Sequence, residues 1–146
     1  MSPLPAGPLR NALIASDSVL IPVKSGHFAL EAVDRLFKYL EWVKEVSHKS
    51  VDVEGILITM HEPNTRVSDI TIRELTAKYG KYMFATSIPR NTALSEASFY
   101  GKPAILYSVN CRGASAYLKL AREILARNVL RASALPPKVA QLSRQA

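Results

Sequence analysis

The sequence predicts an α/β fold in which helices flank a partial parallel sheet. Two short segments, residues 18–24 and 53–60, have apolar centres, a pattern typical of parallel strands that are covered on both faces. Between them, residues 28–46 repeat apolar side chains every three or four positions, which is the period of one face of a helix. Strand, helix and strand in this order are the unit from which parallel sheets are built.

The first third of the chain predicts one strand and two helices. Three prolines indicate that residues 1–10 are irregular, and a short helix over residues 9–16 is expected to follow. The first strand spans residues 18–24, with Pro22 near its end. The helix over residues 28–46 is the best defined of the sequence, because its charged residues lie largely off the apolar stripe.

The middle of the chain repeats the order of strand and helix. Residues 53–60 form the second strand, and a loop follows it. A helix is expected to begin near Ser68 or Asp69, because either side chain can cap the first turn. It ends near Tyr79, where Gly80 can terminate it.

The last third is less regular. Residues 82–88 predict a third strand, and residues 90–102 a long connection with about one helical turn. Residues 104–107 are expected to form a short fourth strand. Apolar positions from residue 117 onward mark a final helix that continues to residue 130. Residues 131–146 predict a basic, disordered tail, so the folded region is expected over residues 11–130.

Composition limits the classes of protein that the chain can represent. It has 146 residues, 48% of them hydrophobic and 21% charged, which is ordinary for a soluble globular domain. No apolar run approaches the roughly 20 residues of a membrane helix, and no secretory signal is visible at the N-terminus. The single Cys111 excludes an internal disulfide. These features predict a cytoplasmic protein that does not bind membranes.

The charge balance allows a polyanionic partner without requiring one. Nineteen Lys and Arg against twelve Asp and Glu give a formal net charge of +7, which permits nucleic-acid binding. The basic residues are scattered, and the C-terminal region is the most one-sided. Two interpretations of that region stay open: a solvated helix face with a frayed end, or an arm that binds nucleic acid.

No phosphate-binding loop and no catalytic or metal-binding cluster is visible. A phosphate cradle needs closely spaced glycines, and Gly101-Lys102 is followed by Pro103 rather than by Ser or Thr. No predicted strand ends in an Asp that would hold Mg²⁺. The histidines do not share a metal-ligand spacing. The glycines are all isolated, at Gly7, Gly26, Gly55, Gly80, Gly101 and Gly113.

Five motifs follow one another along the chain. They are D-S-V-L-I-P-V at 17–23, F-A-L-E at 28–31, G-I-L-I-T-M at 55–60, S-I-P-R-N-T-A-L-S-E-A at 87–97 with G-K-P at 101–103, and G-A-S-A-Y-L at 113–118. In this order they resemble the ParA/Soj family of chromosome- and plasmid-partitioning ATPases, which are relatives of MinD. The resemblance covers roughly residues 9–125 and implies a DNA-segregation protein.

The resemblance is confined to the C-terminal half of a deviant Walker A P-loop NTPase fold. The family opens with a Walker A loop that carries two lysines and later supplies a Walker B aspartate, and residues 3–13 resemble the stretch just after that aspartate. Family members bind ATP and Mg²⁺, whereas we expect this chain to bind neither and not to hydrolyse ATP alone. A truncated gene, a mis-called start codon and a genuine half-protein all remain open.

The resemblance also implies a pocket for the adenine base. In the family, the loops after the T-M strand and after the I-P-R-N strand border the base. The positions of this chain that match those loops are Thr59, Met60, Pro89, Arg90 and Asn91. Met and Pro offer apolar faces to a purine, and amides can read its edge. The alternative is that Pro89 and Asn91 only shape a turn and that Met60 belongs to the core.

A DNA-binding surface is implied more weakly. Family members that coat the nucleoid carry an arginine shortly after the T-M strand, where this chain has Asn64, with Arg66 two residues later. A second family arginine corresponds to Ala93. Arg66 and Arg90 therefore remain as candidates for non-specific contacts to DNA phosphates. By the same resemblance, a ParB-like protein is a further expected partner.

Two other hypotheses belong to different classes. The chain can be a basic interaction module that binds DNA or a partner protein without nucleotide. It can also be a remnant whose apolar strands, residues 19–23 and 56–60, expose a sheet edge. Such an edge promotes dimerisation or aggregation, and it predicts self-association and marginal stability.

Overall fold

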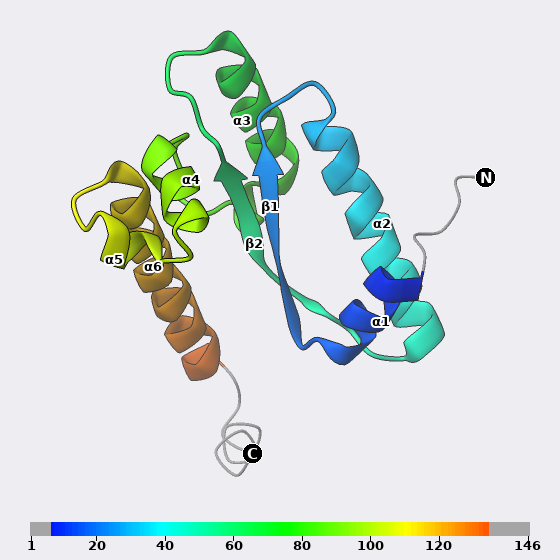
Figure 1. Cartoon of the computed structure of the whole chain (residues 1–146). Helices are drawn as coiled ribbons and strands as arrows, with labels where there is room; N and C mark the ends of the chain where they lie inside the picture. Colours follow the sequence, from blue (N-terminus) through cyan, green and yellow to red (C-terminus); the bar gives the residue numbers. More distant parts are fainter. Residues whose placement is uncertain (1–6, 135–146) are drawn as a thin grey trace. The chain divides into compact units, whose positions relative to one another are not determined.

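The computed structural model describes residues 7–134 and confirms an α/β fold with a small parallel sheet flanked by helices (Figure 1). The chain divides into two compact units, the first reaching to Asn91 and the second beginning at Thr92. The first unit contains the sheet, and the second is helical.

The sheet contains two parallel strands, β1 (Ser18–Lys24) and β2 (Asp52–Thr59). Their register runs from Ser18 opposite Asp52 to Lys24 opposite Thr59. One irregularity occurs where the partner changes from Val53 to Gly55 between successive residues of β1, so β2 carries a bulge there. Both strands lie within one residue of the predicted bounds, because continuous apolar runs of this length are characteristic of buried strands.

Two helices bury the apolar side of this sheet: α2 (Ala29–Ser47) and α3 (Arg66–Tyr79). Val33 of α2 and Leu75 of α3 pack with strand residues in one cluster in which Ile56 and Leu75 are fully buried. Burying an aliphatic side chain of this size contributes about 1.5–3 kcal/mol. The predicted stripe over residues 28–46 is therefore the buried face of α2.

The helix α3 begins earlier than the sequence predicts. Thr65 is its N-cap, and the Thr65 side chain accepts a hydrogen bond from the Ser68 backbone N–H at 3.3 Å. The expected caps, Ser68 and Asp69, therefore lie inside the first turn. Ser68 is buried there, so its place is set by packing as well as by the cap.

A polar clasp joins α2 to the end of α3. Asp34 accepts hydrogen bonds from the Tyr79 hydroxyl at 2.6 Å and from Lys78 Nζ at 2.7 Å. The ring of Tyr79 stacks on Phe37 with centroids 4.6 Å apart. The Lys78 and Tyr79 hydrogen bonds lower the pKa of Asp34, and burial, reinforced by the Asp34 carboxylate, raises the pKa of Tyr79 to about 12.

The helix α1 (Gly7–Ala15) corrects the prediction that residues 1–10 are irregular. Residues 7–10 are helical, because Pro8 in a first turn needs no N–H partner there, and residues 1–6 lie outside the described range. Leu13 of α1 packs on Tyr39, Leu40 and Val43 of α2.

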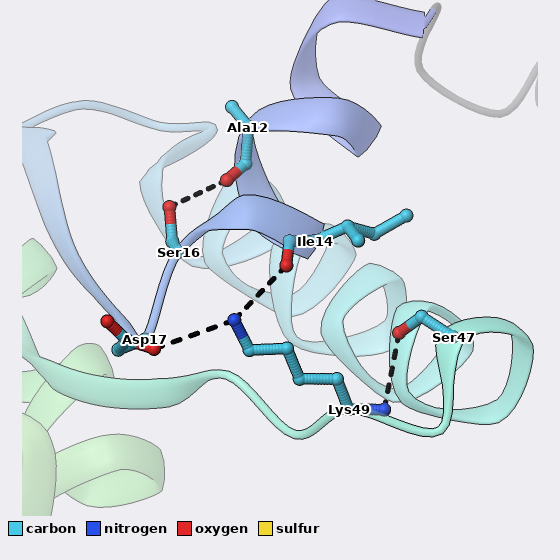
Figure 2. Close-up of polar contacts among 6 residues, drawn as sticks. All are labelled: Ala12, Ile14, Ser16, Asp17, Ser47 and Lys49. Carbon is cyan, nitrogen blue, oxygen red and sulfur yellow. Dashed lines mark hydrogen bonds and ion pairs between the residues drawn. The ribbon is translucent and has the colours of Figure 1, made fainter.

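Polar contacts hold the junction between α1 and β1 (Figure 2). The Ser16 hydroxyl donates a hydrogen bond to the Ala12 carbonyl at 2.6 Å. Lys49 Nζ donates to the Ile14 carbonyl at 3.2 Å and lies 3.5 Å from an oxygen of Asp17. Lys49 thus satisfies a carbonyl at the end of α1 and fixes where the chain enters β1.

The predicted third strand is not a regular strand. After a short 3-10 helix, η1 (Gly80–Tyr82), the chain runs beside β2 with only isolated parallel bridges, Ile56 to Met83 and His61 to Pro89. The Phe84 and Ile88 N–H groups donate to the Ile56 and Ile58 carbonyls, each at 2.9 Å. Four residues of this segment therefore span two residues of β2, and the extra length interrupts the ladder.

Gly55 is required by this close approach. A Cβ atom at Gly55 would lie 2.5 Å from Cε2 of Phe84 and 2.8 Å from the Tyr82 carbonyl oxygen. The glycine of the G-I-L-I-T-M motif is thus explained by packing between β2 and the segment after η1.

The second unit contains α4 (Thr92–Phe99), α5 (Ala104–Tyr107) and α6 (Arg112–Ala134). The predicted strand over residues 104–107 is wrong, since α5 is a helical turn in which the Leu106 and Tyr107 N–H groups donate to the Pro103 carbonyl. A run of four apolar residues carries too little periodicity to separate strand from helix.

The other helices of this unit are longer than predicted. Helix α4 replaces the single expected turn, and α6 begins five residues before residue 117. Helix α6 also includes residues 131–134 of the expected disordered tail; residues 135–146 of that tail lie outside the described range. The α4–α6 contact explains two further motif residues, because a Cβ at Gly113 would lie 2.5 Å from Cγ of Leu94.

Candidate functional site

The loops after β2 and after the neighbouring segment are joined at the carboxyl end of the sheet. The His61 N–H donates to the Ile88 carbonyl at 2.9 Å, and the Arg90 N–H donates to the His61 carbonyl at 3.1 Å. His61 also forms a parallel bridge with Pro89. Ligands of parallel sheets bind outside this end of the strands, so these backbone bonds bring two predicted site segments to one place.

The individual residues take different positions at this edge. Thr59 ends β2 and is half-buried, as are Pro89 and Asn91. Met60 is 58% exposed and has a φ of 49°, in the left-handed region that few non-glycine residues adopt. The alternative that Met60 belongs to the core is therefore wrong, because its thioether lies at the surface beyond the strand.

Arg90 is engaged by an acidic neighbour. Its Nη1 donates to an oxygen of Glu62 at 2.6 Å, and the Arg90 side chain is largely exposed whereas that of Glu62 is about half-exposed. An ion pair of this kind contributes about 0–1 kcal/mol to the stability of the fold. The Glu62 carboxylate nevertheless offsets the positive charge of Arg90 that a phosphate would meet. Arg66, the other cation predicted for DNA, is exposed at the first residue of α3.

The loop after β1 reaches the same end of the sheet. The Gly26 N–H donates to Oγ1 of Thr71 at 3.2 Å, and Thr71 is buried in α3. Phe28, at the start of α2, is 70% exposed. This loop is thus tied to α3 and displays an aromatic ring beyond the strand.

Two buried polar atoms lie just beyond the strand ends. Ser25 Oγ follows β1 and His61 Nδ1 follows β2, and neither has a hydrogen-bond partner among the described residues. Unsatisfied atoms of this kind are expected where water or a ligand completes the site. Neither residue was assigned from the sequence, and neither was Glu62. The only signal for His61 and Glu62 was their place directly after the T-M motif.

Residues 7–134 lack two other features that would indicate a function. They contain no group of three or more His, Cys, Asp and Glu side chains arranged to hold a metal ion. No helix in that range combines the length and apolarity needed to cross a bilayer.

Comparison with known proteins finds curated relatives among partitioning proteins, whereas no family model matches. The chromosome partitioning protein ParA of Caulobacter vibrioides (strain NA1000 / CB15N) is 36% identical over 117 residues, 80% of this chain and 44% of that protein. The sporulation initiation inhibitor protein Soj of Bacillus subtilis is 41% identical over 116 residues, 80% of this chain and 46% of Soj. The chromosome-partitioning ATPase Soj of Treponema pallidum is 37% identical, over 81% of this chain and 47% of that protein. The chain thus spans less than half the length of these relatives.

Solved structures show the same fold in part. The cell division ATPase MinD of Pyrococcus furiosus matches with a TM-score of 0.57 at 19% identity, over 79% of this chain and 45% of MinD. MinD of Pyrococcus horikoshii, solved with Mg-ADP, matches with a TM-score of 0.51 at 16% identity, over 74% of this chain and 41% of that chain. At these identities the likeness concerns the fold alone.

Proposed function

We propose that this chain, which is similar over 80% of its length to the C-terminal part of ParA/Soj partitioning proteins, supplies the nucleobase side of a partitioning ATPase. It does not hold the triphosphate and Mg²⁺, and it does not hydrolyse ATP by itself. The observation that carries this proposal is the pair of backbone hydrogen bonds that joins His61 to Ile88 and Arg90.

The residues at this edge suit a purine base. Met60 and Pro89 offer apolar surfaces, and the Asn91 amide has both donors and an acceptor for a base edge. His61 Nδ1 and Ser25 Oγ are buried polar atoms still able to take a hydrogen-bond partner. Apolar faces with a few convergent polar groups are the usual composition of a small-molecule site.

The phosphate side has no equivalent support within residues 7–134. The two described strands end at Lys24 and Thr59, not at an aspartate that would hold Mg²⁺. The glycines are too far apart to turn successive N–H groups toward an anion. Arg90, at this edge of the sheet, is paired with Glu62. Phosphoryl transfer depends on such cationic and metal contacts, so we expect no turnover.

A phosphate-release assay with the purified chain, ATP and Mg²⁺ tests the absence of hydrolysis. The expected rate equals the background without protein, and a clear rate above it contradicts the proposal. An NMR titration with adenosine tests the base side through the Met60 methyl group. A saturable shift is expected at Met60 and not at Met83, and no shift at saturating adenosine contradicts the assignment.

A second candidate is a basic module that binds DNA without nucleotide. The net charge of +7 favours it, as does the excess of basic residues along α6. Retention on DNA at low salt tests it, with the full chain compared against a chain that ends at residue 130. A large loss in the shortened chain places DNA binding in the C-terminal region. A loss in Arg66→Ala alone places it at α3.

A further inference from the structure

His61 is held by its backbone at the carboxyl end of the sheet. Its N–H donates to the Ile88 carbonyl at 2.9 Å, and its carbonyl accepts from the Arg90 N–H at 3.1 Å. The residue also forms a parallel bridge with Pro89, whose ring is one of the apolar faces proposed for the base. The position of the His61 side chain is therefore set by the segment that supplies part of the proposed base site.

The two ring nitrogens of His61 differ in their surroundings. Nδ1 is buried and has no hydrogen-bond partner among the described residues, whereas Nε2 is not an atom of this kind. Among the same residues, the hydrogen bonds of His61 are those of its backbone, so solvent reaches Nε2. One nitrogen of the ring is therefore hydrated and the other is not.

This difference assigns the proton of the neutral imidazole. A neutral ring carries one N–H donor and one lone-pair acceptor. A proton on Nε2 is hydrated, whereas a proton on Nδ1 would leave a buried N–H without a partner, which costs free energy. Nδ1 is therefore an acceptor that still lacks a donor.

An acceptor without a partner favours a ligand that brings a donor. Adenine carries an exocyclic amine at the position where guanine carries a carbonyl oxygen. The amine can donate to Nδ1, whereas a carbonyl oxygen would face the Nδ1 lone pair and repel it. Unpaired polar groups of this kind are the basis of selectivity in hydrogen-bonding sites.

The other buried unpartnered atom near this end of the sheet, Ser25 Oγ, does not provide the same selectivity. A hydroxyl group rotates and can either donate or accept, so it suits an amine and a carbonyl alike. The loop of Ser25 is also tied to α3, through the Gly26 N–H and Thr71, and not to the segment with Pro89. His61 is thus the residue that can distinguish one base from another.

We infer that Nδ1 of His61 accepts a hydrogen bond from the exocyclic amine of a bound base, and that this contact makes the site selective for adenine. The inference rests on the proposed nucleobase site and adds the residue that determines its specificity. His61 as a whole is half-buried, and the torsion that turns a histidine ring is broad. A rotation of the ring can therefore present Nδ1 to a base that enters the site.

The test compares adenosine with purine riboside, which has the same ring system without the amine. NMR titrations of the chain at mildly alkaline pH follow the Met60 methyl group and the ring nitrogens of the histidines. Adenosine is expected to bind about fivefold more tightly than purine riboside, which is the effect of one neutral hydrogen bond, and to shift the Nδ1 resonance of His61. His48 caps α2 beside the opposite end of the sheet (Figure 1), and its resonances should not shift.

Three variants sharpen the comparison. His61→Phe keeps an aromatic ring without nitrogens and is expected to bind adenosine and purine riboside equally. His61→Asn places an amide oxygen near the position of Nδ1 and should restore part of the preference, which a purely structural role of the ring would not do. His48→Asn is the matched control, because asparagine also tolerates the positive φ of this position, and it should keep the full preference.

The inference is overturned if the ring resonances place the proton on Nδ1 in the chain alone. It is also overturned if adenosine shifts Met60 but leaves Nδ1 unshifted or binds no more tightly than purine riboside, and the proposed base site then stands without it. If adenosine shifts neither Met60 nor His61, the inference and the proposed base site both fail. Because the two nucleosides are compared on the unchanged chain, the result is decisive even where a variant does not fold.

Discussion

The sheet unit and the helical unit bury different kinds of side chain. The first unit encloses large aliphatic residues such as Ile56 and Leu75 between its strands and helices. Among the described residues of the second unit, the buried hydrophobic side chains are those of three alanines and Leu120, whereas larger side chains such as Phe99 and Leu125 are 94% and 66% exposed. The sheet unit thus has a core of its own, while the helical unit displays much of its apolar surface.

A pair of leucine substitutions is expected to show the largest difference in stability between the two units. Leu75→Ala removes a fully buried side chain and is expected to lower the free energy of unfolding by about 2–5 kcal/mol. Leu125→Ala, on the exposed side of α6, should change it by less than about 0.5 kcal/mol. Urea denaturation of both variants measures the difference. Equal losses would mean that the two units share one core.

A pair of glycine substitutions comes next in size. Gly55→Ala places a Cβ within 3 Å of Phe84 and of the Tyr82 carbonyl oxygen, and the overlap is expected to cost about 1–3 kcal/mol. Gly26→Ala is the matched control, because no atom lies within 4 Å of its added Cβ. Thermal melts of the two variants should differ clearly. A Gly55→Ala chain as stable as the control would show that the segment after η1 moves aside freely.

The clasp between α2 and α3 predicts an alkaline dependence of stability that is confined to the sheet unit. Folding raises the pKa of Tyr79 from 10.0 to about 12, so the folded state binds the phenolic proton more tightly than the unfolded state. The resulting stability is complete below pH 10 and is lost as the pH rises toward 12. Tyr79→Phe should flatten this part of the profile in denaturation measured against pH. An unchanged slope would mean that the hydroxyl does not stay bonded to Asp34 in solution.

The smallest expected effect concerns the surface pair at the candidate site. Arg90→Ala removes an exposed ion pair with Glu62 and should change stability by less than about 1 kcal/mol. Its effect on weak DNA retention should also be smaller than that of Arg66→Ala, because Glu62 already offsets the Arg90 charge. Filter binding at low salt compares the two variants, and a larger loss for Arg90→Ala would contradict the assignment.

Several elements were predictable from the sequence for clear physical reasons. The runs that became β1 and β2 are long enough, and apolar enough, to be recognised as buried strands. The helical stripe of α2 followed from periodicity alone. Ligands of parallel sheets lie beyond the carboxyl ends of the strands. This rule predicted a site in the loops after Thr59 and Ile88, and backbone hydrogen bonds join these two loops.

The remaining elements depend on contacts that no local pattern contains. Residues 104–107 are apolar and short, so a helical turn after Pro103 was indistinguishable from a strand. The segment after η1 lost its regular ladder because four of its residues span two of β2. The pairing of Arg90 with Glu62 joins residues 28 positions apart, which charge patterning along the sequence does not reveal. His61 was missed because its buried Nδ1 atom becomes notable only in three dimensions.

We propose that this chain retains the base side of a nucleotide site without the phosphate side. Titration calorimetry with ATP and Mg²⁺, run beside adenosine under identical conditions, tests it most directly. We expect weak binding of both ligands with dissociation constants that agree within about threefold, because within residues 7–134 the glycines are too far apart to align N–H groups toward an anion and Arg90 is already paired with Glu62. A micromolar dissociation constant for ATP together with much weaker binding of adenosine would rule this proposal out, since it would show that the chain itself binds the phosphates.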